Sequence, residues 1–151
     1  MSEITGRCLC GGVSYQAKGP TVFVACHCRD CRYVSGGAPA SILVAQTNGF
    51  ALLSGADLIQ SYTVAGESGH KVMREFCRSC GTPLFERLEI LEPDAMLIKV
   101  GTVDNQDDLR VEATAWTKSA PAWATVDEHT ELFEKNPADE FVGQLLASKA
   151  G

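Results

Sequence analysis

Three closely spaced cysteines near the start of the chain are the residues best suited to chemistry. Cys26, Cys28 and Cys31 lie within six consecutive positions, so their thiols can surround one metal ion on three sides. Thiolates are soft ligands that select zinc, copper(I) or iron–sulfur clusters, and a structural zinc site takes four ligands in a tetrahedron. This group therefore predicts a metal site that is one protein ligand short of closure.

The other four of the seven cysteines form two pairs, and neither pair can hold a metal ion alone. The pairs are Cys8 with Cys10 and Cys77 with Cys80. The second pair follows an alternating, strand-like run and precedes Gly81, which fits a strand, a tight turn and a return strand. In the first pair, side chains two apart on an extended segment would point to the same face. Together the two pairs predict one closed, structural metal site.

This division into four and three predicts two zinc ions with different roles. The ion held by four thiolates would stabilise the fold, because it joins segments that are distant in the sequence. The ion held by Cys26, Cys28 and Cys31 would keep an open coordination position, at which an incoming thiol would bind as a thiolate. A free thiol, with a pKa of about 8.5, is mostly protonated at neutral pH. The three cysteines are therefore the predicted catalytic residues, and the predicted chemistry is that of thiols.

Three residues beside these cysteines are predicted to contact substrate. His27 could be a fourth ligand, a proton carrier or an ordinary turn residue. Arg29 and Arg32 flank Cys31 and could receive the carboxylates of an anionic substrate. Arginines at such positions are also common on surfaces without any such role. These alternatives remain open at the level of sequence.

Length, composition and charge limit the class of protein. The chain has 151 residues, 45% of them hydrophobic, which predicts a single domain spanning residues 1–151. A net charge of -6 argues against a nucleic-acid surface. No run reaches the roughly 18 apolar residues of a membrane span, and the first residues lack the features of a signal peptide. We therefore expect a cytoplasmic protein with no membrane or nucleic-acid partner, in which cysteines serve as metal ligands more often than as disulfides.

Short β-like runs separated by turn signals dominate the chain and predict a mainly β fold. Residues 13–17 alternate apolar and polar side chains, and residues 22–25 lead directly into the group of three cysteines. Further strands are expected at residues 41–44, 50–53, 58–64, 71–76, 84–86, 96–100 and 111–116. The metal ligands must then lie on turns between strands.

One helix is expected, at the C-terminus. Asn136 can cap it, Pro137 suits its first position, and the apolar residues between positions 141 and 146 form one face. Trp116 and Trp123 are expected to cover the core or the edges of the zinc sites, because large aromatic side chains mainly serve packing.

The segments that carry the cysteines resemble the glutathione-dependent formaldehyde-activating enzyme family, which includes centromere protein V. The resemblance rests on residues 6–15, 26–32 and 76–84, and more loosely on residues 100–104, 115–116 and 120–123. It implies a fold of two packed β-sheets, the β-tent. It also implies a structural zinc on Cys8, Cys10, Cys77 and Cys80 and a catalytic zinc on the other three cysteines, in agreement with the ligand count.

The resemblance further implies an activity. The named reaction joins glutathione to formaldehyde and gives S-(hydroxymethyl)glutathione, which is a carbon–sulfur lyase reaction in reverse. Glutathione or another small thiol and a small electrophile are therefore the expected partners. The residues also leave open a non-catalytic, zinc-stapled binding module and an iron–sulfur protein. They give no information on the oligomeric state.

Overall fold

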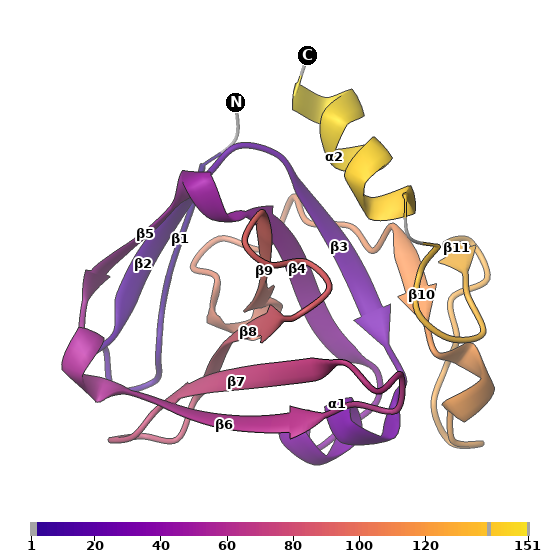
Figure 1. Ribbon diagram of the computed structural model, residues 1–151, viewed down its shortest axis with the longest axis horizontal. Helices are drawn as coiled ribbons and strands as arrows, with labels where there is room; N and C mark the ends of the chain where they lie inside the picture. The colour runs from indigo at the N-terminus through magenta and orange to yellow at the C-terminus, as the bar shows by residue number, and fades with distance from the viewer. Residues whose placement is uncertain (1–2, 139, 151) are drawn as a thin grey trace.

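Two β-sheets that lean together make up most of the molecule (Figure 1). A computed structural model describes residues 3–138 and 140–150, so the predicted domain limits at residues 1 and 151 lie outside the described residues. The smaller sheet is antiparallel, with the strand order β1-β2-β5. Its strands are β1 (Glu3–Arg7), β2 (Ser14–Lys18) and β5 (Phe50–Ser54).

The larger sheet has the strand order β11-β10-β3-β4-β9-β8-β7-β6. Its neighbouring strands are antiparallel, except that β10 runs parallel to both β3 and β11. Its strands are β3 (Thr21–Cys26), β4 (Ala40–Gln46), β6 (Ile59–Ala65), β7 (Lys71–Cys77), β8 (Pro83–Leu88), β9 (Ala95–Lys99), β10 (Ala113–Ala115) and β11 (Glu131–Leu132). The mainly β, two-sheet fold is confirmed, and each of the nine predicted runs contains a strand. The sequence did not predict β1 and β11.

Both faces of the larger sheet are apolar, because alternate residues of its central strands point to opposite sides. On β4, Leu43 faces the smaller sheet, whereas its neighbours Ile42 and Val44 face the other side. We call the buried residues between the two sheets the inner core; they include Tyr15, Leu43, Phe85 and Ile98. We call those on the opposite face the outer core; they include Val24, Ile42, Val44 and Leu97. A strand buried on both faces needs a nearly continuous apolar run, which β4 supplies.

Two α-helices lie against the larger sheet. The predicted C-terminal helix is present as α2 (Phe141–Ala150), but its expected start was wrong. Pro137 precedes the helix, and Asn136 accepts a hydrogen bond from the Trp116 indole Nε1 at 2.8 Å instead of capping it. The Asn136 side chain, which the local sequence pattern assigned to a helix cap, is thus used in a tertiary contact. None of the helices in residues 3–138 and 140–150 is long and apolar enough to cross a membrane.

The second helix, α1 (Arg29–Ser35), was not predicted. It begins directly after Cys28, whose Sγ accepts a hydrogen bond from the Cys31 backbone N–H at 3.2 Å. It ends at Gly36, which has a left-handed backbone conformation with φ of 76°. Four short 3-10 helices complete the described elements: η1 (Thr47–Gly49), η2 (Ala56–Leu58), η3 (Val100–Thr102) and η4 (Thr117–Ser119).

Candidate metal centres

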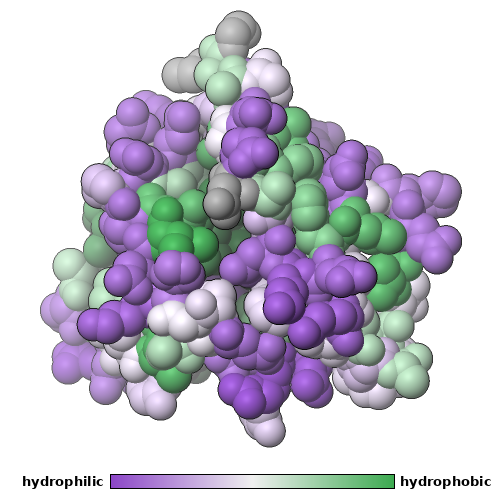
Figure 2. Space-filling model, turned by 45° about the vertical axis from the view of Figure 1, so that its right-hand side comes forward, coloured by the Kyte–Doolittle hydropathy of each residue, from purple (hydrophilic) through white to green (hydrophobic). Residues whose placement is uncertain are grey.

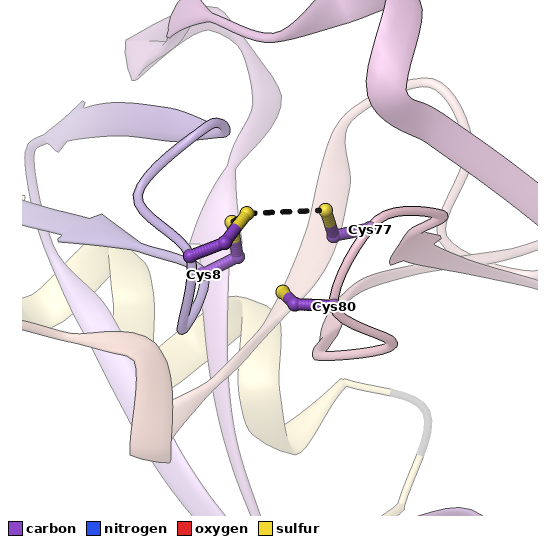
Figure 3. Close-up of side chains that lie close together, drawn as sticks. Cys8, Cys77 and Cys80 are labelled. Atoms are coloured by element: carbon purple, nitrogen blue, oxygen red, sulfur yellow. Dashed lines mark hydrogen bonds between the residues drawn. The ribbon is translucent and has the colours of Figure 1, made fainter.

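The four outer cysteines come together between two loops. Cys8 and Cys10 lie on the loop after β1, and Cys77 and Cys80 lie at the turn from β7 to β8; in Figure 3, Cys8 faces Cys77 and Cys80. All four Sγ atoms lie within 4.8 Å of one another. The distances are 3.5 Å from Cys8 to Cys10 and 3.9 Å from Cys10 to Cys77. Tetrahedral zinc–thiolate bonds place sulfur atoms about 3.8 Å apart, so the cluster fits a zinc ion.

Each loop turns tightly around its cysteine pair. The Gly11 N–H donates to the Cys8 carbonyl at 3.0 Å, and the Gly81 N–H donates to the Cys77 carbonyl at 2.7 Å. Both glycines have a φ of 77°, a conformation that other residues rarely adopt. The expectation of an extended Cys8–Cys10 segment was therefore wrong, since a turn presents both thiols to the same point.

The four-cysteine cluster is continuous with the inner core. Cys8 and Cys77 are fully buried there, whereas Cys10 lies at the surface. Polar groups of the loops contact the sulfurs: the Val13 N–H donates to Cys8 Sγ at 3.3 Å, and the Thr82 hydroxyl lies 3.1 Å from Cys80 Sγ. The Thr82 contact is the main cause that lowers the pKa of Cys80 to about 5. The Gly12 N–H acts to lower the pKa of Cys10, but the contacts with Cys8 and Cys80 outweigh it and raise this pKa to about 11, so the four thiols share their protons unequally.

Cys26, Cys28 and Cys31 form a second cluster on the opposite face of the larger sheet. Cys26 ends β3, Cys28 precedes α1, and Cys31 lies in the first turn of that helix. Their Sγ atoms also lie within 4.8 Å of one another. Cys26 and Cys31 are buried in the outer core, and Cys28 is half-buried. All seven cysteines lie in the described residues and are free.

The three thiols share their protons unequally. Contacts from the Cys26 and Cys31 thiols lower the pKa of Cys28 far below its usual value, and the Cys31 N–H and the Arg74 charge act in the same direction. The contact with Cys28, then that with Cys31 and burial, raise the pKa of Cys26 well above its usual value. A single thiolate thus suppresses ionisation of its neighbours, as expected for closely coupled acids. A bound cation would replace the remaining protons.

A cavity of about 590 Å³ opens beside the three-cysteine cluster. All three of these cysteines line it, whereas none of the four outer cysteines does. Its floor is the outer core of β3, β4 and β9, and its far wall is formed by Trp116 and the segment that leads into α2. Figure 2 turns the side of β10 and β11 forward and shows hydrophobic residues gathered around a hollowed region with a hydrophilic border. The three-cysteine cluster is thus the one that borders a cavity in which a ligand could bind.

Three buried charges lie on the face of the sheet that carries this cavity. The Glu86 carboxylate on β8 pairs with Arg74 of β7 and, at 2.9 Å, with Lys99 Nζ of β9. The three residues are at most 9% exposed. One carboxylate between two cations leaves a net positive charge, and Arg74 acts on the thiols of Cys28 and Cys31. The Arg74 charge favours a thiolate at Cys28, whose pKa it helps to lower.

Replacing Glu86 with glutamine should destabilise the protein by about 3 kcal/mol, because two buried cations would lose their shared carboxylate. The free energy of unfolding, from urea denaturation of the wild type and of Glu86→Gln, measures the effect. Glu75→Gln is the matched control, since Glu75 pairs with Arg87 across the same two strands in a more exposed position. The control should cost less than about 1 kcal/mol. If both variants lost the same free energy of unfolding, the buried ion pairs of Glu86 would contribute no more to stability than the more exposed pair of Glu75.

The structure places the predicted substrate-binding residues away from the cavity. His27 is fully buried, and neither ring nitrogen has a hydrogen-bond partner among the described residues; burial lowers its pKa. Arg29 is exposed and pairs with Asp30 at 3.1 Å, and Arg32 is partly buried. Of the residues that separate the three cysteines, Asp30 lines the cavity, whereas His27 and Arg29 do not. Substrate contact by His27, Arg29 and Arg32 stays a prediction.

Sequence reasoning missed the charged residues that line the cavity. Arg74 and Glu86 are among its lining residues, together with His70, around which the sequence shows no motif. A signal was present: Glu86 is a charged residue in the mostly apolar start of β8 and lies two positions before Leu88, so it shares the face of that leucine. A charge at an apolar position of a buried strand needs a partner.

The two tryptophans have different environments. Trp116 is 6% exposed, lines the cavity beside the three-cysteine cluster and has a left-handed backbone with φ of 58°. Its expected packing role is confirmed. The same expectation for Trp123 was wrong, because this side chain is 70% exposed. No local pattern distinguishes them, since their burial depends on distant segments.

Comparisons with known proteins agree with this architecture. A family model described as "Glutathione-dependent formaldehyde-activating enzyme" matches residues 3–119, well over half of the chain. No curated protein matches significantly. The fold is similar to the crystal structure of a Rhodobacter sphaeroides protein from a structural genomics programme. The two superimpose over 67% of this chain and 88% of that protein, with a TM-score of 0.55. The sequence identity is 20%, so this similarity concerns the fold alone.

Proposed function

The chain belongs to the glutathione-dependent formaldehyde-activating enzyme family, and on this basis we propose that it is a zinc-dependent carbon–sulfur lyase that acts on glutathione adducts. The proposed reaction is the reversible condensation of glutathione with formaldehyde or a related electrophile. It forms a bond between the thiol sulfur and the carbonyl carbon, and the reverse reaction breaks that bond. Because glutathione is a partner, we also propose that the protein acts in the cytoplasm.

The observation that supports this proposal best is the different setting of the two cysteine clusters. The four-cysteine cluster joins two loops and continues into the inner core, as expected of a site that stabilises a fold. The three-cysteine cluster borders a cavity. A purely structural role would not need that cavity, which favours an enzyme over a zinc-stapled binding module.

We propose that Cys8, Cys10, Cys77 and Cys80 hold a structural zinc and that Cys26, Cys28 and Cys31 hold a catalytic one. When bound to the three cysteines, zinc would supply an open coordination position and lower the pKa of a thiol that occupies it. All three cysteines line the cavity, so a thiol bound to that ion would reach it from the cavity. The fold excludes bulk water from two of the cysteines, since Cys26 and Cys31 are buried.

The residues around the cavity have separate tasks in this proposal. The buried cation Arg74 favours negative charge beside the cysteines, which assists a thiol in giving up its proton. The apolar floor holds the electrophile close to the sulfur, so that the two reactants meet in a fixed orientation. The carbonyl oxygen then takes up a proton as the carbon–sulfur bond forms. We assign this proton to water at the cavity mouth, because His27 is buried away from it.

The proposal predicts that the zinc-loaded protein accelerates exchange between free glutathione and its formaldehyde adduct. Exchange NMR at equilibrium measures this rate directly, even though the uncatalysed reaction also proceeds. The rate above the spontaneous background should rise in proportion to protein concentration, and metal analysis should give two zinc ions per chain. An exchange rate that does not depend on protein concentration would reject the proposed reaction. A coloured protein that contains iron would reject the zinc assignment.

A further inference from the structure

The cavity beside the three-cysteine cluster is much larger than formaldehyde requires. Its volume is about 590 Å³, within the range of pockets that bind drug-sized ligands. Formaldehyde has two heavy atoms and occupies a volume comparable to one or two waters, on the order of 30–60 Å³. Formaldehyde alone would leave most of the space near the thiols filled with solvent.

The interior of the cavity is apolar. Its floor consists of Val24, Ile42, Val44 and Leu97, which are all buried in the outer core, and Leu88 continues it at one side. The charged residues that reach this depth, Arg74 and Glu86, already pair with each other, and Glu86 also pairs with Lys99. The floor therefore suits a hydrocarbon group better than the carboxylates and peptide groups of glutathione.

The mouth of the cavity is polar. Glu67, Ser68 and His70, at the turn between β6 and β7, are exposed lining residues, and exposed Asn136 stands on the opposite side. These side chains offer charge and hydrogen bonds at the cavity mouth, where the glutathione backbone would lie if its thiol pointed inward. The two parts of the site thus differ in chemistry: a polar mouth for the thiol carrier and an apolar floor for what the thiol attacks.

We propose that the physiological electrophile is an aldehyde with an apolar body of several carbons, and that this body lies on the floor formed by β3, β4 and β9. The inference rests on the proposed function. The glutathione sulfur forms a bond to the aldehyde carbon, the π electrons of the C=O bond move to oxygen, and this oxygen takes up one proton for the one that the thiol released. No oxidant or reductant is needed.

The test compares binding of two stable thioethers, S-methylglutathione and S-hexylglutathione, to the zinc-loaded full chain by titration calorimetry. They share the tripeptide and differ by five methylenes, and burial of each methylene is worth up to about fourfold in affinity. S-Hexylglutathione should bind at least tenfold more tightly than S-methylglutathione. Equal affinities would overturn the inference and leave the proposed function intact. Free glutathione is titrated alongside, because a thioether cannot bind as a thiolate. Binding of glutathione alone would overturn the inference, and failure of all three compounds to bind would reject glutathione as the thiol, and with it both proposals.

A pair of matched variants locates the hexyl group. Ile90 lines the cavity and is 47% exposed, so Ile90→Glu adds a carboxylate at the apolar wall without burying it. This variant should lose several-fold of the preference for the hexyl compound. Leu53→Glu is the control, because Leu53 is 57% exposed on β5 and does not line the cavity. It should keep the preference; equal effects of both variants would contradict the proposed position of the apolar group.

Discussion

Replacing Cys80 with serine should leave a chain that no longer unfolds cooperatively. The four-cysteine cluster joins the loop after β1 to the turn between β7 and β8, so the proposed metal would close a long loop and extend the inner core. Structural zinc sites contribute apparent binding free energies of about 10–16 kcal/mol, which equals or exceeds the total stability of an ordinary domain. Loss of one of four ligands should therefore remove most of the folded population.

Thermal unfolding by circular dichroism and zinc analysis measure this effect. The variant should lack the cooperative transition of the wild type and should aggregate or bind less zinc. Ser79→Ala is the control within the same turn, because Ser79 is exposed and belongs to neither cysteine cluster. It should unfold like the wild type. A Cys80→Ser protein that melts cooperatively within a few degrees of the wild type would contradict the structural role of this cluster.

Replacing Cys28 with serine should abolish the glutathione-dependent reaction and spare the fold. Cys28 is half-buried, as Cys80 is, so the two substitutions are matched in chemistry and burial. Serine is also a good helix N-cap, so it can accept the Cys31 N–H hydrogen bond that Cys28 accepts at the start of α1. Loss of the metal's contribution should lower the rate by about a hundredfold or more.

Three measurements together test this separation of roles. Cys28→Ser should retain the cooperative thermal transition, lose one zinc per chain and show no exchange above the spontaneous rate. Tyr33→Ala is a control on the same helix, since Tyr33 is 82% exposed and does not line the cavity; it should retain activity. Comparable loss of folding in Cys28→Ser and Cys80→Ser would show that both clusters are structural. That outcome would favour the zinc-stapled binding module.

The sequence alone determined the grouping of the cysteines and the strands. Thiols that are two or three residues apart lie close together because of local chain geometry. The grouping of Cys26, Cys28 and Cys31 could therefore be predicted from their spacing. The pairs at Cys8 and Cys77 could be joined by counting alone, because neither pair can complete a tetrahedron. The strands were visible because a sheet with buried faces imposes period-two or continuous apolar runs.

Local patterns failed where a distant segment decides the outcome. Asn136 has the features of a helix cap, but the indole of Trp116 takes its side-chain oxygen. Trp116 and Trp123 look alike in sequence, yet one is buried against the outer core and the other is exposed. The short helix α1 depends on the cap provided by Cys28, a residue that sequence reasoning assigned only to metal.

The sequence by itself determined which cysteines belong together and, through them, the family. Only the tertiary structure decided that the two clusters lie on opposite faces of one sheet, and that one of them borders a cavity with an apolar floor and a buried net positive charge. The reason is physical. Short spacings and the number of thiols that one ion needs are properties of the sequence. Burial, access and charge balance arise from contacts among distant strands and the C-terminal segment, which meet only when the chain folds.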